Sequence, residues 1–260
     1  MSNLKTEKLG VHASDLDLSK VPDIKLPEPA PDGRICVLSD KGYATVDLME
    51  TSQAFTDYSA TCSLPVLDIG TAYGEVTVAA LKKGSIVIAN DVEQGSLDYI
   101  VKRKELTDDD RQRLYLKKGY VPKDMDFEPN SLGGIHASRV MHFFTPEEVQ
   151  TFFTKAREWL VRDGVIFLVT SSPYHWFTPE GFGEEYEKKF KEGVEFPGII
   201  TDFSYIDKNL KTGGYNNAMD PKLIYREAVK NDFLIKKLGY EKGRYDYDYT
   251  FAILVNRKKE

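Results

Sequence analysis

Residues 64–94 combine glycines and acidic residues at a spacing that suits the binding of a nucleoside. A short apolar run ends at Asp68, a turn with Gly70 and Gly74 follows, and a second apolar run ends at Asp91. Glycine has no Cβ, so the backbone can approach a ligand closely there. A carboxylate about twenty residues past such a turn can accept hydrogen bonds from both hydroxyls of a ribose. We therefore expect a ligand that contains adenosine.

The turn lacks the features of the common phosphate-binding loops. A dinucleotide fingerprint needs a small residue where this chain has Glu75, whose negative charge would repel a diphosphate. The Gly-Lys-Ser/Thr of a P-loop does not follow either. What remains is an adenosine ligand without phosphate, carrying a positive group that Asp68 would attract. The alternative is an α/β turn that binds nothing, because an isolated glycine loop is weak evidence of a site.

The segment resembles motifs I and II of class I S-adenosylmethionine (SAM)-dependent methyltransferases. The family pattern is acidic-x-Gly-x-Gly-x-Gly, followed by an acidic residue at the end of the next strand. This sequence matches it with Asp68, Gly70, Gly74 and Asp91, and has Ala72 in place of the middle glycine. The resemblance implies that Gly70 and Ala72 line the methionine part of SAM. It also implies that Asp68 helps to hold the ammonium group and that Asp91 holds the ribose.

Composition narrows the class of protein. At 260 residues, of which 41% are apolar and 12% aromatic, the chain can bury a substantial core in one elaborated domain. A net charge of -6 makes a nucleic-acid partner unlikely. Cys36 and Cys62 alone imply no disulfide framework, which favours a reducing compartment. Because no signal peptide or membrane-spanning run is visible, we expect a soluble, cytoplasmic protein.

The order of apolar and amphipathic stretches predicts an α/β fold. We expect a three-layer sandwich with a seven-stranded, mostly parallel sheet and an antiparallel C-terminal hairpin like that of the methyltransferases. Residues 1–34 are polar and rich in proline, which predicts an extended N-terminal arm. Residues 35–260 would form the methyltransferase domain. An aromatic insertion at about 171–219 lies at the carboxyl edge of the sheet, where a substrate cap would be built.

Further cofactor contacts are expected where other strands end. Methyltransferases commonly place an acidic residue after the third strand to accept the adenine amino group, but this chain has Tyr120 there. Backbone groups of Tyr120 and Val121 could replace that contact, or Asp124 or Asp126 could make it. Two more residues complete the expected cofactor set, Val92 directly after Asp91 and Ser138 after the fourth strand.

The transfer itself requires alignment of the acceptor, exclusion of water and, for a hydroxyl or ammonium acceptor, a base. Histidine is the natural base near neutral pH. His12 lies in the arm and His136 inside a predicted strand, so His175 is the preferred base and His142 the second candidate. Residues expected to bind the substrate are Arg139, Tyr174, Trp176 and Phe177. No His, Asp and Glu cluster has metal-ligand spacing, so no metal is expected.

These features predict a SAM-dependent methyltransferase that acts on a small aromatic or apolar metabolite. The alternatives are methylation of a protein or an RNA, and a non-catalytic SAM-binding protein. The acidic charge lowers the RNA alternative. The segment after the fourth strand also lacks the Asn-Pro-Pro-Tyr-like string of many amino-group methylases.

Overall fold

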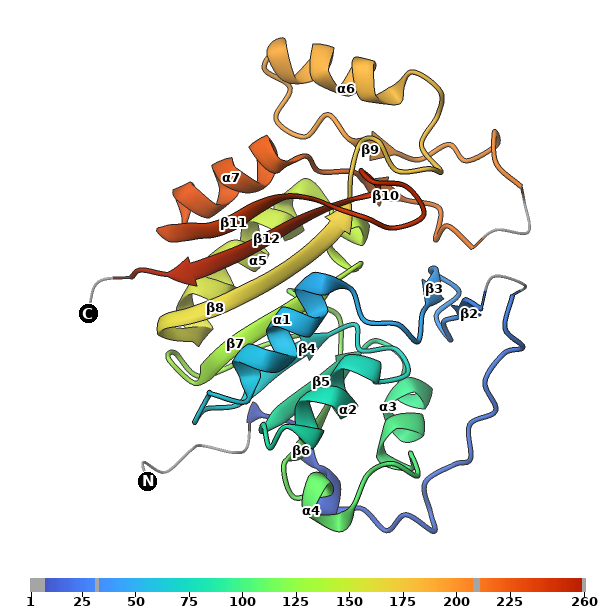
Figure 1. The fold of residues 1–260 in the computed structure, drawn as a ribbon, viewed down its shortest axis with the longest axis vertical. Helices are drawn as coiled ribbons and strands as arrows, with labels where there is room; N and C mark the ends of the chain where they lie inside the picture. Colours follow the sequence, from blue (N-terminus) through green and yellow to red (C-terminus); the bar gives the residue numbers. More distant parts are fainter. Residues whose placement is uncertain (1–7, 31–32, 208–210, 259–260) are drawn as a thin grey trace.

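The apolar runs of the sequence form the strands of one central sheet (Figure 1). The structure is a computed structural model, and it describes residues 8–30, 33–207 and 211–258. The strand order in the sheet is β1-β6-β5-β4-β7-β8-β12-β11. Strands β6, β5, β4, β7 and β8 are mutually parallel, and the pairs β1–β6, β8–β12 and β12–β11 are antiparallel. The strands span Val11–His12 (β1), Val66–Ile69 (β4), Val87–Asp91 (β5), Leu114–Lys118 (β6), Leu132–Ser138 (β7), Leu160–Ser171 (β8), Phe233–Glu241 (β11) and Tyr249–Asn256 (β12).

This sheet confirms the expected α/β class, its mostly parallel strands and its antiparallel C-terminal hairpin. It has one strand more than the seven expected, because β1 from the N-terminal arm pairs with β6 and places Val11 opposite Leu116. Next to β1, Leu9 and Ala13 are buried against the domain. The N-terminal arm is therefore packed against the domain at this point, whereas its polar composition predicted an extended segment.

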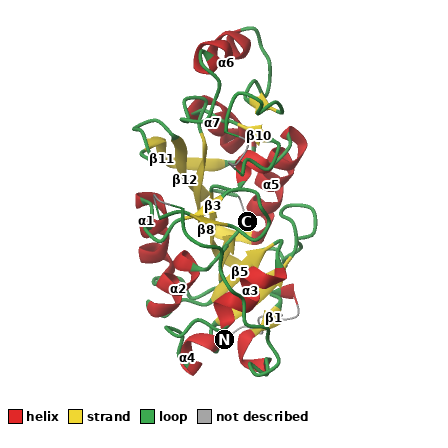
Figure 2. Cartoon of the chain, turned by 90° about the vertical axis from the view of Figure 1, so that its right-hand side faces the viewer, coloured by secondary structure: helices red, strands yellow, loops and turns green. Residues whose placement is uncertain are grey.

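Helices cover both faces of the sheet and make three layers (Figure 2). One face is covered by α1 (Glu50–Ser59), α2 (Glu75–Lys82) and α3 (Gln94–Val101), and the other by α5 (Pro146–Trp159) and α7 (Pro221–Lys230). Successive residues of a strand point to opposite faces. In β8, Phe167 accordingly packs with the first set of helices, and Ile166 and Leu168 pack with the second. A short helix, α4 (Asp108–Arg111), precedes β6.

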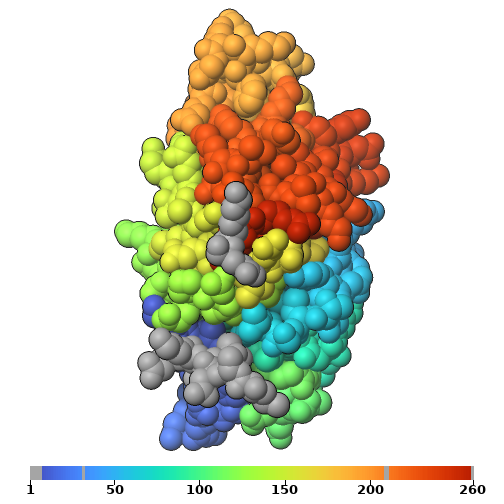
Figure 3. All heavy atoms as spheres, turned by 90° about the vertical axis from the view of Figure 1, so that its left-hand side faces the viewer, coloured from blue at the N-terminus to red at the C-terminus, as the bar shows by residue number. Residues whose placement is uncertain are grey.

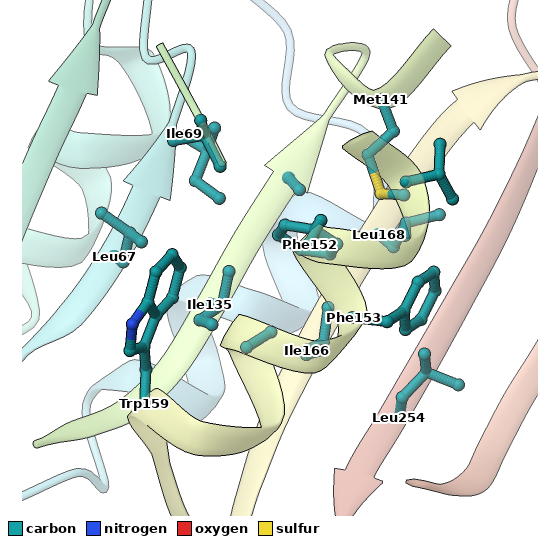
Figure 4. Close-up of a cluster of buried hydrophobic side chains, with 14 of the residues drawn as sticks. Leu67, Ile69, Ile135, Met141, Phe152, Phe153, Trp159, Ile166, Leu168 and Leu254 are labelled. Atoms are coloured by element: carbon teal, nitrogen blue, oxygen red, sulfur yellow. The ribbon is translucent and has the colours of Figure 1, made fainter. Parts of the chain in front are cut away.

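Helix α5 begins as its sequence predicts. The side chain of Thr145 accepts the N–H of Glu148 at 3.3 Å, and the Glu148 carboxylate accepts the N–H of Thr145 at 2.9 Å. Such a cap is worth about 1 kcal/mol to the helix. The large side chains of α5 point toward the sheet and form much of the core on that face (Figure 4), namely Phe152, Phe153 and Trp159.

The segment between β8 and α7 forms a lobe at one end of the molecule, shown in orange in Figure 3. It contains α6 (Phe182–Lys191), β9 (Ile199–Ile200) and β10 (Asn216–Asn217). A small core of its own includes Phe182, Tyr186 and Ile200. The N–H of Met219 donates to the carbonyl of Ser171 at 2.9 Å, which ties the end of the lobe to the end of β8.

Two short strands, β2 (Ile35–Cys36) and β3 (Tyr43–Ala44), form a hairpin before α1. In Figure 1 this hairpin lies on the side of the molecule toward which β8 points. A 3-10 turn, Met141–Phe143, follows β7. None of the helices in the described ranges is long and apolar enough to cross a membrane.

Candidate active site

A cavity of about 690 Å³ lies at the carboxyl ends of the parallel strands. The chain adds strands on one side of β4 as far as β6 and then continues on the other side with β7. At such a switch point the connections after the two adjacent strands run to opposite faces of the sheet, which opens a crevice between them. The volume suits a small-molecule ligand. Of the site residues expected from the sequence, Gly74 and Tyr174 do not line the cavity, whereas the others do: Asp68, Gly70, Ala72, Asp91, Val92, Tyr120, Val121, Ser138, Arg139, His142, His175, Trp176 and Phe177.

The turn after β4 uses its small residues in different ways. Gly70 and Ala72 line the cavity in left-handed conformations, with φ of 63° and 49°. A Cβ on Gly70 would collide with the side chain of Val140, so glycine is required there. A Cβ on Gly74 would lie 2.6 Å from Cγ1 of Ile100, which shows that Gly74 allows α2 to pack against α3. Gly74 is therefore a packing residue in this structure, in contrast to the cofactor contact expected from the sequence.

Glu75 is less repulsive to a diphosphate than its position in the sequence suggests. Its carboxylate accepts hydrogen bonds from the Arg103 guanidinium at 2.6 and 3.3 Å, and the Arg103 side chain is largely buried. An ion pair of this kind neutralises much of the carboxylate's field. The charge of Glu75 is therefore weaker evidence against a dinucleotide than the sequence suggested.

Asp91 ends β5 as predicted and is fixed by the backbone around it. Its Oδ2 accepts the N–H of Ala72 and its Oδ1 accepts the N–H of Glu93, both at 2.9 Å. Burial raises the pKa of Asp91 to about 6, and the two N–H contacts oppose that rise. The carboxylate retains lone pairs for further donors, since each oxygen can accept more than one hydrogen bond.

Asp68 lies between β5 and β7 and is bound to other side chains. Its Oδ1 accepts from Nδ1 of His136 at 2.7 Å, and its Oδ2 accepts from the Thr77 hydroxyl at 2.7 Å. Nε2 of His136 lies 3.0 Å from the Ser52 hydroxyl of α1, and the His136 ring stacks on Phe55 at 4.9 Å. Asp68 thus holds a chain of polar contacts that reaches α1, in addition to facing the cavity.

His136 is the functional candidate that sequence reasoning missed. Its place inside a strand suggested a simple core position, yet it lines the cavity and is 2% exposed. The register of the parallel pair puts His136 beside Asp68. The sequence did contain a signal. Asp68 lies two positions before Gly70, and His136 lies two positions before Ser138, so each polar residue comes just before a residue expected to contact the cofactor.

The adenine contact proposed for the third strand is only partly available. The N–H of Tyr120 donates to Oδ2 of Asp124 at 3.0 Å, and the Tyr120 hydroxyl donates to Glu148 at 3.0 Å. Asp126 pairs with Lys8 at 2.7 Å. Neither Asp124 nor Asp126 lines the cavity, whereas Tyr120 and Val121 do. A contact with adenine at this strand would therefore come from Tyr120 or Val121.

His142 and His175 line the cavity and are 8% and 4% exposed. Burial lowers the pKa of each to about 3, helped by the positive charge of Arg139 at His142 and by His142 and Arg34 at His175. Nδ1 of His142 accepts the N–H of Ser171, and Nδ1 of His175 accepts the N–H of Phe177, both at 3.4 Å. A neutral imidazole whose Nδ1 accepts carries its hydrogen on Nε2. Both rings are therefore neutral N–H donors at neutral pH.

The insertion contributes to the cavity with some of its aromatic residues only. Trp176 and Phe177 line it, and the guanidinium groups of Arg34 and Arg244 lie 5.6 and 5.5 Å from the Trp176 ring. Tyr174 instead is 42% exposed and packs edge-on against Tyr240 at 5.8 Å. Trp176 and Phe177 of the insertion therefore face the cavity, whereas Tyr174 packs outside it.

The segment that forms much of this cavity is similar to known proteins. Residues 66–164, which include β4, the turn, β5, β7 and α5, match the family model described as "Methyltransferase domain". This segment of the chain is therefore similar to a methyltransferase domain. The match covers the residues on which the expectation of a SAM-dependent methyltransferase rested, and it supports that expectation. No curated protein matched the chain.

The fold of the methyltransferase domain is also found in solved structures. A SAM-dependent methyltransferase from Methanosarcina mazei has a TM-score of 0.62 at 15% identity, covering 82% of this chain and 100% of that one. The 1,6-didemethyltoxoflavin-N1-methyltransferase of Burkholderia thailandensis has a TM-score of 0.54 at 13% identity, covering 81% and 78%. The glycopeptide N-methyltransferase MtfA has a TM-score of 0.56 at 18% identity, covering 83% and 92%. At these identities the likeness concerns the fold.

The residues of the cavity fit SAM. The Ser138 hydroxyl is buried and has no hydrogen-bond partner among the described residues, so it is available to a polar ligand. The Asp91 carboxylate, the left-handed turn at Gly70 and Ala72, and the end of β6 surround one part of the cavity. In the described part of the chain, no three or more His, Cys, Asp or Glu side chains gather as they would around a metal ion.

Proposed function

We propose that this protein transfers a methyl group from SAM to a small molecule held in the same cavity. One observation carries the proposal: a single cavity is lined by Gly70 of the turn and Asp91 at the end of β5, and also by Trp176 and Phe177 of the insertion. A cofactor and an acceptor can therefore meet there. The two neighbours MtfA and the 1,6-didemethyltoxoflavin-N1-methyltransferase share the fold and are named for different acceptors, a glycopeptide and 1,6-didemethyltoxoflavin.

SAM supplies an activated methyl group when it is bound, so the chain's residues have to bind, orient and exclude water. Asp91 would accept hydrogen bonds from the ribose hydroxyls, and Ser138 would pair with a polar group of the cofactor. Asp68 would attract the ammonium group while its hydrogen bonds to His136 and Thr77 keep the carboxylate in place. The buried rings of His142 and His175 and the side chain of Trp176 would keep water from the acceptor.

The role of His175 as the general base stays a prediction. A base works best when its pKa lies near the working pH, and a pKa of about 3 makes a weak base. We therefore expect His175 and His142 to orient the acceptor as Nε2–H donors, with alignment as the main source of the rate. Well-oriented reactants gain as much as about 7–11 kcal/mol from proximity alone.

The decisive experiment incubates the protein with SAM labelled on its methyl group and separates the products. Label in a low-molecular-weight fraction of a cell extract supports the proposal. Label in protein or RNA would instead support the alternative acceptors. SAM binding by calorimetry without any transfer would favour a non-catalytic binding protein, and the absence of SAM binding would refute the proposal.

Trp176 tests the acceptor part of the cavity. We expect Trp176→Ala to reduce turnover and acceptor affinity while SAM affinity changes by less than about threefold, or under about 1 kcal/mol. Tyr174→Ala is the matched control, because Tyr174 belongs to the same segment but lies outside the cavity. Melting temperatures of both variants identify general destabilisation. Normal catalysis by folded Trp176→Ala protein would contradict a role in acceptor binding.

The cytoplasmic location also stays a prediction. Cys36 and Cys62 are both free thiols, which is in keeping with the reducing compartment expected from the sequence. Fractionation of cells that express the full chain would test it.

A further inference from the structure

The part of the cavity that faces the acceptor is positively charged, although the protein has a net charge of -6. Among the described residues, three of the acidic residues that line the cavity, Asp68, Glu75 and Asp91, belong to the motif I and II segment, and Asp47 is the fourth. Six described basic residues line the cavity outside that segment: Arg34, Lys41, Arg139, Lys211, Lys242 and Arg244. A cleft lined by one sign of charge attracts ligands of the opposite sign. The asymmetry indicates an anionic acceptor.

Some of this charge is neutralised by neighbouring carboxylates and some is not. Lys211 and Lys242 each have a carboxylate at 3.4 Å, from Asp40 and Asp246 respectively. Arg139, by contrast, makes no ion pair with any described residue; its side chain donates to the neutral hydroxyl of Thr45 at 3.2 Å and also contacts the neutral hydroxyl of Tyr249. A guanidinium has five N–H donors in a planar fork. Arg139 can therefore bind a planar anion with donors to spare.

The backbone of Arg139 is held in a costly conformation at the end of β7. Its φ is 57°, in the left-handed region, and its N–H donates to the carbonyl of Val169 on β8 at 2.7 Å. A residue other than glycine is strained there by about 1–2 kcal/mol. Strain of this kind is found where a side chain has to be aimed at a ligand. The position thus favours a binding role for the Arg139 side chain.

Neutral polar groups without described partners line the same cavity. Asn216 on β10 is 1% exposed, and neither its Nδ2 nor its Oδ1 has a partner among the described residues. The Ser171 hydroxyl is also buried without a described partner. Leaving such groups unsatisfied costs about 1–3 kcal/mol each. A ligand that pairs with Asn216 and Ser171 removes that cost.

These donors are rigidly placed. Nδ2 of Asn217 donates to the carbonyl of Phe144 at 3.1 Å, which fixes β10 against the turn that carries His142. Ser171 is fixed from two sides, because its N–H donates to His142 and its carbonyl accepts the N–H of Met219. With the Nε2–H groups of His142 and His175, the acceptor part of the cavity therefore presents mainly hydrogen-bond donors.

We propose that the methyl acceptor is an aromatic carboxylate whose carboxylate group binds the guanidinium of Arg139. Asn216 and Ser171 add neutral hydrogen bonds, and the aromatic ring packs against Trp176 and Phe177. The inference rests on the proposed methyl transfer and narrows its acceptor to one chemical class. A planar carboxylate matches the planar guanidinium fork, and neutral donors can share its oxygens.

Binding of matched pairs of compounds tests this assignment. The probes are benzoate, indole-3-carboxylate and 2-naphthoate, each beside its primary amide, with phenyl phosphate as a third anion. Affinities are measured by ligand-observed NMR on the protein with S-adenosylhomocysteine present. We expect at least one carboxylate to bind about tenfold more tightly than its amide, because a charge-assisted pair is about twice as strong as a neutral hydrogen bond.

Variants identify the residue responsible. Arg139→Gln should reduce carboxylate affinity about tenfold and leave amide affinity unchanged. Arg257→Gln removes an arginine that pairs with Asp163 outside the cavity, so it should change neither. Asn216→Asp, which is nearly isosteric, places a negative charge in the cavity and should also weaken carboxylate binding. Melting temperatures show whether each variant is folded.

Several results would overturn the assignment. These are equal binding of carboxylates and amides, unchanged carboxylate binding in folded Arg139→Gln protein, tighter binding of phenyl phosphate than of every carboxylate, and no carboxylate binding at millimolar concentration. Calorimetry with SAM on the same samples separates this inference from the proposed function. If the wild-type protein binds SAM and shows no carboxylate preference, the acceptor assignment alone is wrong. If it does not bind SAM, the methyl-transfer proposal is wrong.

Discussion

Protonation of Asp91 should weaken SAM binding and stabilise the ligand-free protein at the same time. The carboxylate is 8% exposed, and burial raises its pKa from 3.8 to about 6. That rise corresponds to about 3 kcal/mol, at about 1.4 kcal/mol for each pH unit. Because the folded pKa is the higher one, this group destabilises the fold above pH 6. The destabilisation is lost as the pH falls from about 6 toward 4.

Ligand affinity should change in the opposite direction. The ionised carboxylate accepts hydrogen bonds from the ribose hydroxyls, and a proton on one oxygen removes an acceptor site. At pH 5, one unit below the pKa, roughly ten of eleven molecules are protonated at Asp91, so SAM affinity should be about tenfold lower than at pH 7.5. His142 and His175 do not titrate in this range, because their pKa values are about 3.

Calorimetric titration of the protein with SAM from pH 5 to 8 measures this effect. Asp91→Asn is the matched control, since an amide of nearly the same shape cannot titrate there. At pH 7.5 this variant should bind SAM at least about tenfold more weakly, because a charged hydrogen bond is worth about 1.5–3 kcal/mol. Between pH 5 and 7 its remaining affinity should not show the wild-type slope. Equal pH slopes in both proteins, or equal affinities at pH 7.5, would refute the assignment of Asp91 to the ribose.

Two further predictions concern the fold around the cavity. Gly70→Ala should lower both the melting temperature and SAM affinity, because its Cβ would collide with Val140; Gly84→Ala is the control, since Gly84 also has a left-handed φ of 88° but open space around it. If both variants lost melting temperature and SAM affinity equally, the collision with Val140 would be excluded as the cause, because the left-handed backbone alone would account for the losses. Glu241→Gln should destabilise the protein by about 1–2 kcal/mol in urea unfolding, since it weakens the carboxylate that caps α1 at the N–H and hydroxyl of Thr51. An unchanged unfolding midpoint would exclude that cap as a source of stability.

Most of the residues expected to bind the cofactor could be placed at one cavity from the sequence, because they are close together in the chain. The turn at Gly70, the two acidic strand ends and the helix after them belong to one local β-α-β unit, and spacing alone places Asp91 beside the turn. Ala72, which departs from the family pattern, still adopts the left-handed conformation, and its N–H anchors Asp91. The substitution therefore keeps the geometry of the motif.

Other features depend on register and burial, which spacing does not determine. His136 lies beside Asp68 only because β4 and β7 pair in one particular register. Position after a strand end indicated correctly that His142 and His175 reach the cavity. It did not indicate that burial keeps them neutral or that backbone N–H groups occupy their Nδ1 atoms. The added edge strand β1 is two residues long, too short for an alternating pattern to be recognised.

Polar contacts fix helix α1 to the residues around the cavity at two places. Ser52 lies against His136, which binds Asp68 beneath the cofactor part, and Thr51 is held by Glu241 at the end of β11. Buried hydrogen bonds fix position more strictly than apolar packing does, because an unsatisfied group is costly. Residues just after β11 line the acceptor part. The same helix therefore sets the distance between the two parts of the cavity, on which in-line methyl transfer depends.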